Sequence, residues 1–165
     1  MRNDFTMTSI EKLSSVSQFN SQRGQETLHP LVTVIDQAKS NKIKMTQYLS
    51  EIYIVFLKDV RCEDFQYGRT KYDYQEETLL FISPDQVFGL EKTKDELIQP
   101  KGWALAFHPD FIKGTPLSRK VKEYGFFSYH VTEALHMSER ERQIVLECFK
   151  KIQEELQRGT DKHST

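Results

Sequence analysis

Side chains that could bind a metal ion are scattered along this sequence rather than gathered in a motif. A metal ion needs three or four ligands that converge on one point. The five histidines share no HxH or HExxH spacing, and none lies near both cysteines; they are His29, His108, His130, His136 and His163. Isolated histidines are more often surface groups or hydrogen-bonded core groups than ligands. We therefore predict no metal site and no cofactor.

The acidic pairs Glu76-Glu77 and Asp95-Glu96 are the remaining candidates for proton transfer. Neighbouring side chains on a strand point to opposite faces, so adjacent carboxylates are more typical of a solvated loop than of a catalytic dyad. The sequence also lacks the GxGxxG and GxxxxGK[ST] phosphate-binding motifs and the GxSxG nucleophile elbow. We predict that the chain is not an enzyme.

Aromatic residues are the strongest compositional feature. The chain has seven Tyr, eleven Phe and one Trp, and most of them lie between Tyr48 and Tyr129. Aromatic side chains suit the half-buried surface of a pleated sheet. They also line ligand cavities. Both explanations remain open at this point.

The elements that would position these rings are mostly strands. Apolar or alternating runs between turn residues predict strands near residues 31–36, 51–58, 65–67, 71–74, 78–82, 87–90 and 102–108. The run Glu51–Lys58 has no helical period, which is typical of a strand buried on both faces. Short strands without interleaved helices predict an antiparallel barrel or sandwich, and a parallel α/β sheet is disfavoured.

Alternation in the last of these strands leaves two orientations open. Trp103, Leu105 and Phe107 share one face, and Ala104, Ala106 and His108 share the other. Large residues pointing inward would fill the interior, whereas small ones would leave room for a ligand beside His108. The candidate ligand-binding residues, for which ordinary core packing is the alternative, are Tyr53, Phe56, Tyr72, Tyr74, Trp103 and His108.

The rear of the chain is predicted to be helical. Thr115-Pro116 is typical of a helix start, and Gly125 of a helix end. Ser138 and Glu141 form a capping box before a helix that runs to about Arg158 and spans about 30 Å. Its apolar stripe lies either on the sheet or against a second copy of the chain, and its members are the candidate dimer interface: Val145, Phe149, Ile152 and Leu156.

The front of the chain, residues 1–27, is expected to be a flexible N-terminal arm. Ile10, Leu13 and Val16 have near-helical spacing, but the serines among them weaken that pattern, and Arg23-Gly24 is typical of a hinge. We therefore divide the chain into an arm (1–27), a β-rich domain (28–112) and a helical segment (113–165).

Composition narrows the class of protein. The 165 residues fit one domain, and 23 basic against 24 acidic side chains give a net charge of −1, which argues against a strong grip on nucleic acid. No apolar run is long enough to cross a bilayer, and none follows the N-terminus as in a secretory signal. We expect a cytoplasmic protein without membrane contact, whose Cys62 and Cys148 are free thiols.

Several segments, in this order, resemble one family. They are Leu28–Val32, Tyr72–Glu76, Thr78–Gln86, Gly102–Asp110, Lys122–Tyr129, Glu133–Leu135 and Ser138–Glu141. Together they are similar to the N-terminal sensory domain of AraC-type bacterial transcription regulators, over about residues 28–158. The order of these segments along the chain carries the resemblance.

The resemblance implies a fold that is mainly β with C-terminal helices: a cupin-like antiparallel β-barrel of the jelly-roll type, followed by an α-helical dimerisation segment. It also implies a small-molecule effector such as a sugar or an aromatic metabolite, a homodimer, and DNA binding through a separate C-terminal helix-turn-helix domain that this chain lacks. On this view the front arm closes over the occupied barrel, and deleting residues 1–27 would change the ligand response more than the stability.

Two alternatives stay open. Metal-dependent cupin enzymes, such as isomerases and dioxygenases, use an HxH…E…H set that this sequence lacks, and the first of its positions falls among aromatic and acidic residues at 72–77. The other alternative is a dimerisation module whose barrel is packed and binds no ligand.

Overall fold

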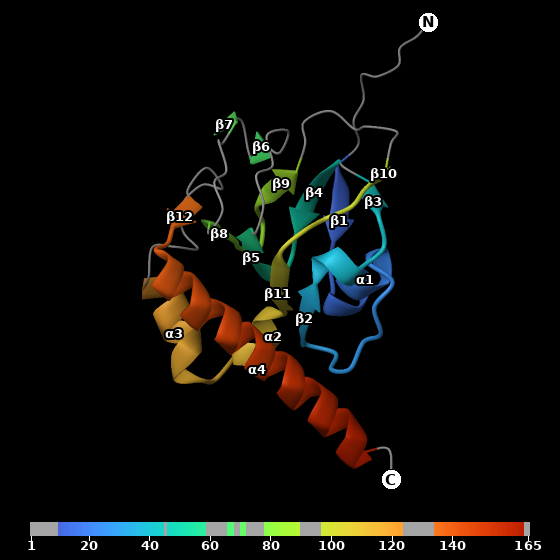
Figure 1. Ribbon diagram of the computed structural model, residues 1–165, viewed down its shortest axis with the longest axis vertical. Helices are drawn as coiled ribbons and strands as arrows, with labels where there is room; N and C mark the ends of the chain where they lie inside the picture. The colour runs from blue at the N-terminus through green and yellow to red at the C-terminus, as the bar shows by residue number, and fades with distance from the viewer. Residues whose placement is uncertain are drawn as a thin grey trace, which may run out of the picture.

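The computed structural model describes residues 10–44, 46–58, 66–67, 70–71, 78–89, 97–123 and 134–163. Their fold is mainly β-sheet with a long C-terminal helix (Figure 1). The strands are β1 (Glu11–Leu13), β2 (Val32–Asp36), β3 (Ile43–Lys44), β4 (Gln47–Ser50), β5 (Tyr53–Lys58), β6 (Gln66–Tyr67), β7 (Thr70–Lys71), β8 (Thr78–Ile82), β9 (Val87–Gly89), β10 (Leu97–Ile98), β11 (Trp103–Phe107) and β12 (Ala134–His136). The helices are α1 (Val16–Gln22), the 3₁₀ turn η1 (Gln37–Lys39), α2 (Pro109–Ile112), α3 (Pro116–Glu123) and α4 (Glu139–His163).

The largest sheet has five antiparallel strands in the order β12-β8-β5-β11-β2. Its central strand β5 is buried on both faces, as its continuous apolar run predicts. In the register, Ala104 pairs with Phe56 on one side and with Ile35 on the other. Residues of three neighbouring strands therefore form continuous rows on each face.

A second, mixed sheet has the order β1-β4-β9, in which β1 runs parallel to β4 and β9 runs antiparallel to it. Two further pairs, β3 with β10 and β6 with β7, are antiparallel. None of these sheets closes into a barrel over the strands that the structure describes. The prediction of a mainly β chain with C-terminal helices is confirmed at this level.

The two faces of the five-stranded sheet have different coverings. The inner face packs against β1, α1 and β9, and its fully buried members include Ile54, Leu80, Ala104 and Ala106. The outer face carries Val55, Leu57 and Trp103, among others, and lies under α4. The alternation in β11 is thus resolved: the small residues point inward, and Trp103 and Leu105 point toward the helix.

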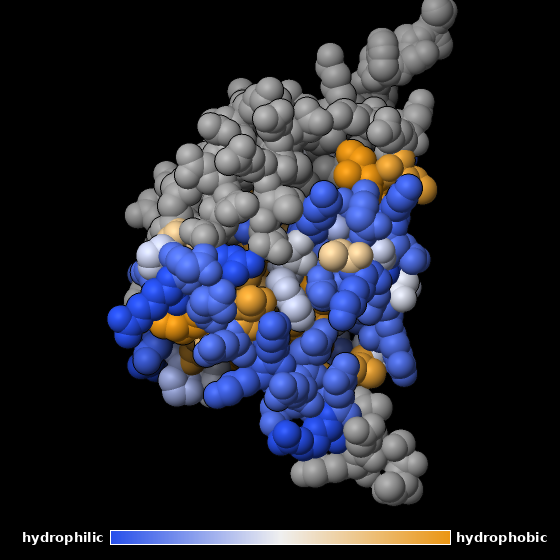
Figure 2. Space-filling view, in the orientation of Figure 1, coloured by the Kyte–Doolittle hydropathy of each residue, from blue (hydrophilic) through white to orange (hydrophobic). Residues whose placement is uncertain are grey.

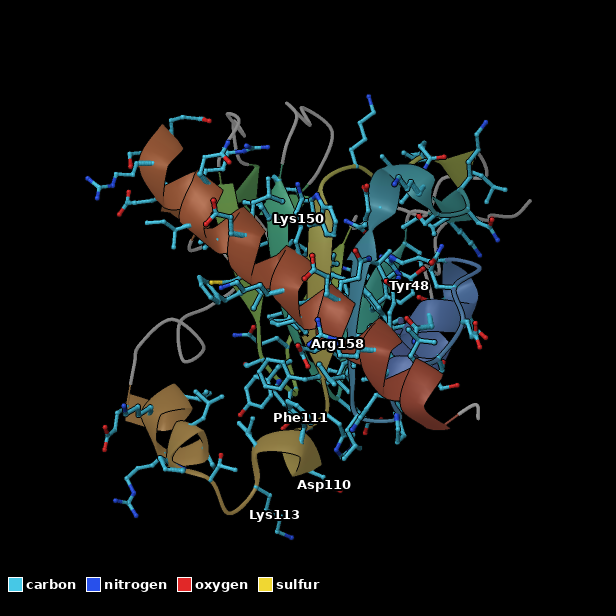
Figure 3. All side chains as sticks on the ribbon, turned by 60° about the horizontal axis from the view of Figure 1, so that its bottom comes forward. Tyr48, Asp110, Phe111, Lys113, Lys150 and Arg158 are labelled. Atoms are coloured by element: carbon cyan, nitrogen blue, oxygen red, sulfur yellow. The ribbon has the colours of Figure 1, made fainter. Side chains whose placement is uncertain are left out.

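Helix α4 begins where the capping box predicts. The Ser138 hydroxyl accepts from the Glu141 amide (3.2 Å), and the Glu141 carboxylate accepts from the Ser138 amide (2.8 Å). The helix has 25 residues and crosses the sheet diagonally (Figures 1 and 3). Helix α3 likewise begins at Pro116, as predicted.

Residues 10–27 differ from the expected flexible arm. Strand β1 pairs with β4, and α1 is capped by the Ser15 side chain, which accepts from the Gln18 amide. Leu13, Val16 and Phe19 are 0–1% exposed in the inner core. The apolar residues outweigh the low helix propensity of the serines because they complete the cover of the inner face, so this segment belongs to the folded body.

Where the structure describes the chain, the face drawn in Figure 2 is mostly hydrophilic, with small, separate hydrophobic patches. In the described part of the chain, the exposed large apolar side chains are Ile10, Leu97, Phe111, Leu117 and Ile144. Among the described residues, no helix combines the length and the apolar character needed to cross a membrane.

Candidate ligand-binding site

A small cavity lies on the inner side of the five-stranded sheet. Its volume is about 30 Å³, and it is partly open to solvent. The walls come from η1, β3, β4, β5 and β9 and from the end of α1. Its polar lining consists of Arg23, Gln37, Thr46, Tyr48 and Lys58, and its apolar lining of Ile43, Phe56, Phe88, Gly89 and Pro100.

Two positively charged side chains line this cavity although both are buried. Arg23 and Lys58 are each 5% exposed. Arg23 is the C-cap residue that follows α1, and Lys58 is the last residue of β5, so the two charges come from different elements. A guanidinium keeps its charge at all ordinary pH values, and burying such a charge is favourable only with close polar partners.

A buried glutamine holds Arg23 in place. The Arg23 Nε donates to Gln37 Oε1 at 3.0 Å, and Gln37 is 1% exposed. The Gln37 Nε2 donates to the Lys101 carbonyl at 3.3 Å, and the Gln37 amide donates to the Gly102 carbonyl at 2.8 Å. Gln37 thereby connects the guanidinium to the backbone just before β11, so the position of Arg23 depends on the packing of η1 against this segment.

Aromatic rings form a continuous wall beside these charges. Phe19, Phe56 and Phe88 follow one another with ring centroids 6.5 and 6.1 Å apart, and Tyr48 continues the row 5.6 Å from Phe88. The Arg23 guanidinium lies 3.9 Å over the Phe19 ring, and the Lys58 ammonium 5.0 Å over the Phe56 ring. Both separations are within the range of cation–π attraction.

Tyr48 lies where the wall reaches the surface. Figure 3 shows it on the side of α1, away from α2. Its hydroxyl donates to the Lys44 carbonyl at 3.1 Å. Burial raises the pKa of the Tyr48 hydroxyl, the negative charge of Glu11 raises it further, and the positive charge of Arg23 lowers it. The charge of Arg23 therefore acts on the Tyr48 hydroxyl, which also lines the cavity.

Gly89 gives the cavity its shape at the end of β9. Its φ is +109°, a conformation that residues with a side chain rarely adopt, and a Cβ there would run into the Thr46 carbonyl oxygen. The close approach of β9 to residue 46 therefore requires glycine.

The structure brings one of the predicted ligand-binding residues, Phe56, to this cavity. Trp103 lies on the outer face with the α4 cluster, and Tyr53 stacks on Phe107 at 5.0 Å beside α2 and α3. Burial raises the pKa of the Tyr53 hydroxyl there. Strand alternation explains the difference, because Tyr53 and Trp103 occupy positions of opposite parity to Phe56 and Ala104 in the register. Tyr72 and Tyr74 lie outside the described residues.

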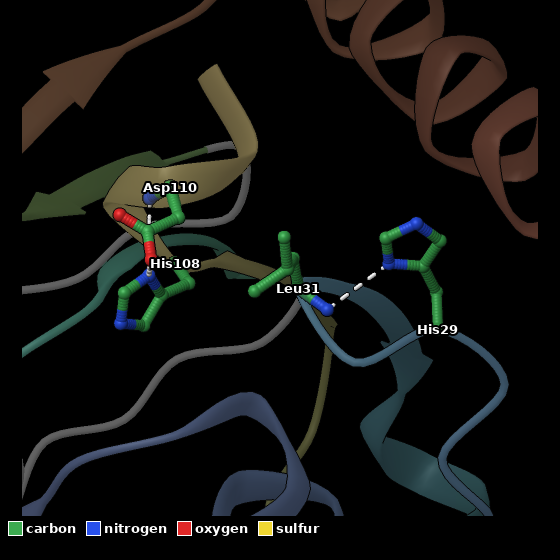
Figure 4. Close-up of polar contacts among 4 residues, drawn as sticks. All are labelled: His29, Leu31, His108 and Asp110. Carbon is green, nitrogen blue, oxygen red and sulfur yellow. Dashed lines mark hydrogen bonds and ion pairs between the residues drawn. The ribbon is translucent and has the colours of Figure 1, made fainter. Parts of the chain in front are cut away.

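His108 is also away from the cavity. It caps α2, where its Nδ1 accepts from the Asp110 amide at 3.0 Å and lies 3.6 Å from the Asp110 carboxylate (Figure 4). His29 makes a similar local contact, since its Nδ1 accepts from the Leu31 amide at 3.0 Å (Figure 4). Within the described part of the chain, no three His, Cys, Asp or Glu side chains are grouped so that they could hold a metal ion.

The predicted dimer stripe packs within the chain. Phe149 is 4% exposed in the outer cluster, where Val145 and Ile152 also lie, and Leu156 packs on the cluster around Phe107. The stripe therefore covers the chain's own sheet, the first of the two arrangements left open by the sequence. Cys148 is exposed on α4 and is a free thiol, whereas Cys62 lies outside the described residues.

Sequence reasoning missed the charged part of the site. Lys58 shares its face of β5 with Ile54 and Phe56, so alternation alone would have placed it beside the predicted ring. Arg23 carried a weaker signal, because the glycine after it indicates a helix end but not where the side chain points. Nothing in the local sequence indicates that η1 brings Gln37 to Arg23.

Comparisons of this chain with protein-family models, with curated proteins and with solved structures give no match.

Proposed function

We propose that this chain is the small-molecule-sensing and dimerisation domain of an AraC-type transcription regulator. In this proposal the two facing sheets correspond to the halves of a cupin-like jelly-roll barrel, and the cavity between them receives the effector. DNA would be bound by a separate helix-turn-helix domain, and the chain would act as a cytoplasmic homodimer without catalytic activity.

The observation that carries the proposal is the polar lining of an otherwise apolar interior. Ligand sites are mostly apolar hollows with a few polar groups that fix the orientation of the ligand. Arg23, Gln37 and Lys58 are such groups, each at most 5% exposed, beside a wall of rings. Ala104 and Ala106 point inward, so the side chains on that face of β11 are small. The resemblance described above points in the same direction.

The small volume of the cavity favours a second candidate. About 30 Å³ exceeds the roughly 10–15 Å³ that one water molecule requires, but whole metabolites occupy sites of about 300 Å³ or more. A packed interior that only supports dimerisation through the helices would show such a volume. The sensing proposal instead requires that part of the ligand extend out of the open side or that the walls move apart.

Ligand-dependent stability distinguishes the two candidates. A panel of monosaccharides, aromatic acids and short carboxylic acids at millimolar concentration should contain a compound that raises the melting temperature in a concentration-dependent way. Phe56→Leu should weaken that effect, because the ring lines the cavity. Phe81→Leu, a matched change on the outer face of the same sheet, should not.

The possible results separate the candidates as follows. No stabilisation by any member of the panel would refute the sensing function and leave the packed dimerisation module. Equal effects of the two variants would place the ligand elsewhere and refute the cavity as the site. Stoichiometric iron, zinc or manganese in the purified protein would support a cupin-like enzyme instead.

A further inference from the structure

The positive charges at the cavity bear on the chemical class of its ligand. Of the ten described residues that line the cavity, two are cations that are nineteen-twentieths buried, and they come from different elements. No acidic residue is among the described residues that line the cavity. A neutral sugar is recognised by mixed donors and acceptors, whereas Arg and Lys side chains offer donors only.

We propose that the cavity binds the carboxylate group of a small monocarboxylic acid, between Arg23 and Lys58. This inference rests on the proposed function and deepens it, since it names the class of effector. The carboxylate occupies the enclosed end of the cavity, and the apolar part of the acid extends along the rings of Phe88 and Tyr48 toward the open side.

The size of the cavity agrees with this arrangement. Its volume of about 30 Å³ is two to three times the minimum for one water molecule, which suits a group of a few atoms such as a carboxylate rather than a sugar ring. Because the cavity is partly open, the remainder of the acid need not fit inside it.

The electrostatic surroundings are also suitable. Charge-assisted hydrogen bonds from Arg or Lys to a carboxylate are shorter and stronger than neutral ones, and low-dielectric walls strengthen them further. The neutral Gln37 holds the guanidinium through its Nε, and one outer nitrogen, Nη1, donates to Gln22 Oε1 at 3.4 Å. Both cations have additional contacts within the chain, and the carboxylate would join these contacts rather than fill a vacancy.

Propionate and its neutral isostere propionamide test the proposal on the unmodified chain. Isothermal titration calorimetry at physiological salt should show that propionate binds at least about tenfold more tightly than propionamide, a difference of about 1.4 kcal/mol. Benzoate and benzamide should show the same order. Propionate should also raise the pKa of Tyr48, measured by NMR with ¹³C-labelled tyrosine, because it adds a negative charge near that hydroxyl.

Charge-removing variants locate the effect. Lys58→Met keeps the length and the apolar stem of the side chain and should weaken propionate binding at least about tenfold. Lys150→Met removes the same charge from an exposed side chain on α4, outside the cavity lining, and should change propionate binding less than about twofold. The comparison of propionate with propionamide uses the unmodified chain, so it tests the carboxylate site even if Lys58→Met does not fold.

The outcomes also separate this inference from the proposed function. Equal binding of acid and amide, or equal loss in the two lysine variants, would overturn the carboxylate site. If a neutral compound of the panel then bound, and Phe56→Leu weakened that binding, the sensing function would remain supported without a carboxylate site. If neither acids nor neutral compounds bound, both proposals would fail.

Discussion

Replacing Phe19 with alanine tests whether the front of the chain belongs to the folded body. Phe19 is fully buried, packs 6.5 Å from the Phe56 ring and carries the Arg23 guanidinium 3.9 Å over its face. Truncating a fully buried phenylalanine removes its burial and leaves a cavity, at a cost of about 3–5 kcal/mol. For a domain of this size, that lowers the melting temperature by about 6–20 °C.

The assay is urea denaturation followed by the fluorescence of Trp103, the single tryptophan, which is partly buried under α4. Ile10→Ala is the matched control, because Ile10 lies in the same segment but is 50% exposed, and its loss should cost less than about 0.5 kcal/mol. If Phe19→Ala cost no more than Ile10→Ala, the segment would be the flexible arm and the reasoning would be refuted.

Two further predictions concern the backbone and a helix cap. Gly89→Ala should destabilise the protein by about 1–3 kcal/mol, because Gly89 has a positive φ and a Cβ there would clash with the Thr46 carbonyl. Gly159→Ala is the matched change at an open position on α4 and should stabilise the protein by up to about 1 kcal/mol. Melting temperatures that shift in the same direction in both variants would contradict this expectation. Ser138→Ala should cost about 0.5–2 kcal/mol at pH 7 by urea denaturation. Hydrogen bonds from Ser138 lower the pKa of Glu141 below its usual 4.5, so the stability they confer is present above that pH and is lost as the pH falls through the lowered value. The larger of these bonds comes from the Ser138 backbone amide, which Ser138→Ala keeps, and the smaller from the hydroxyl, which it removes. The difference between wild type and Ser138→Ala should therefore narrow only in part at pH 3, and an unchanged difference would rule out a contribution from the bond between the hydroxyl and the carboxylate.

The strands and the start of the last helix could be predicted from the sequence because their signals are local. The apolar run of β5 and the turn at Pro84-Asp85 are recognisable from periodicity and residue type. The Ser138–Glu141 pair needs only residues three positions apart. Such features do not depend on what packs against them.

The orientation of the strands and the role of the front segment could not be predicted, because both depend on distant contacts. Alternation shows that Trp103 and Ala104 point to opposite faces, but only α4 and α1 decide which face is inside. Residues 10–23 are rich in polar side chains, and they fold because β4 and the inner face of the sheet are available to them.

The positions of the charged residues in the site also depend on contacts between residues that are distant in the sequence. Arg23 and Gln37 are fourteen positions apart and meet only through the packing of α1 beside η1. Lys58 is an exception, since its parity with Phe56 was available from the sequence.

Ring resonances provide the most direct measurement of whether a small molecule enters the cavity. In a protein with ¹³C-labelled phenylalanine, saturation with the tightest-binding panel compound should shift the signals of Phe56 and Phe88, which line the cavity. Phe81 and Phe149, on the outer face under α4, should keep their positions. Unchanged Phe56 and Phe88 signals, or shifts confined to the outer pair, would contradict ligand sensing at this site.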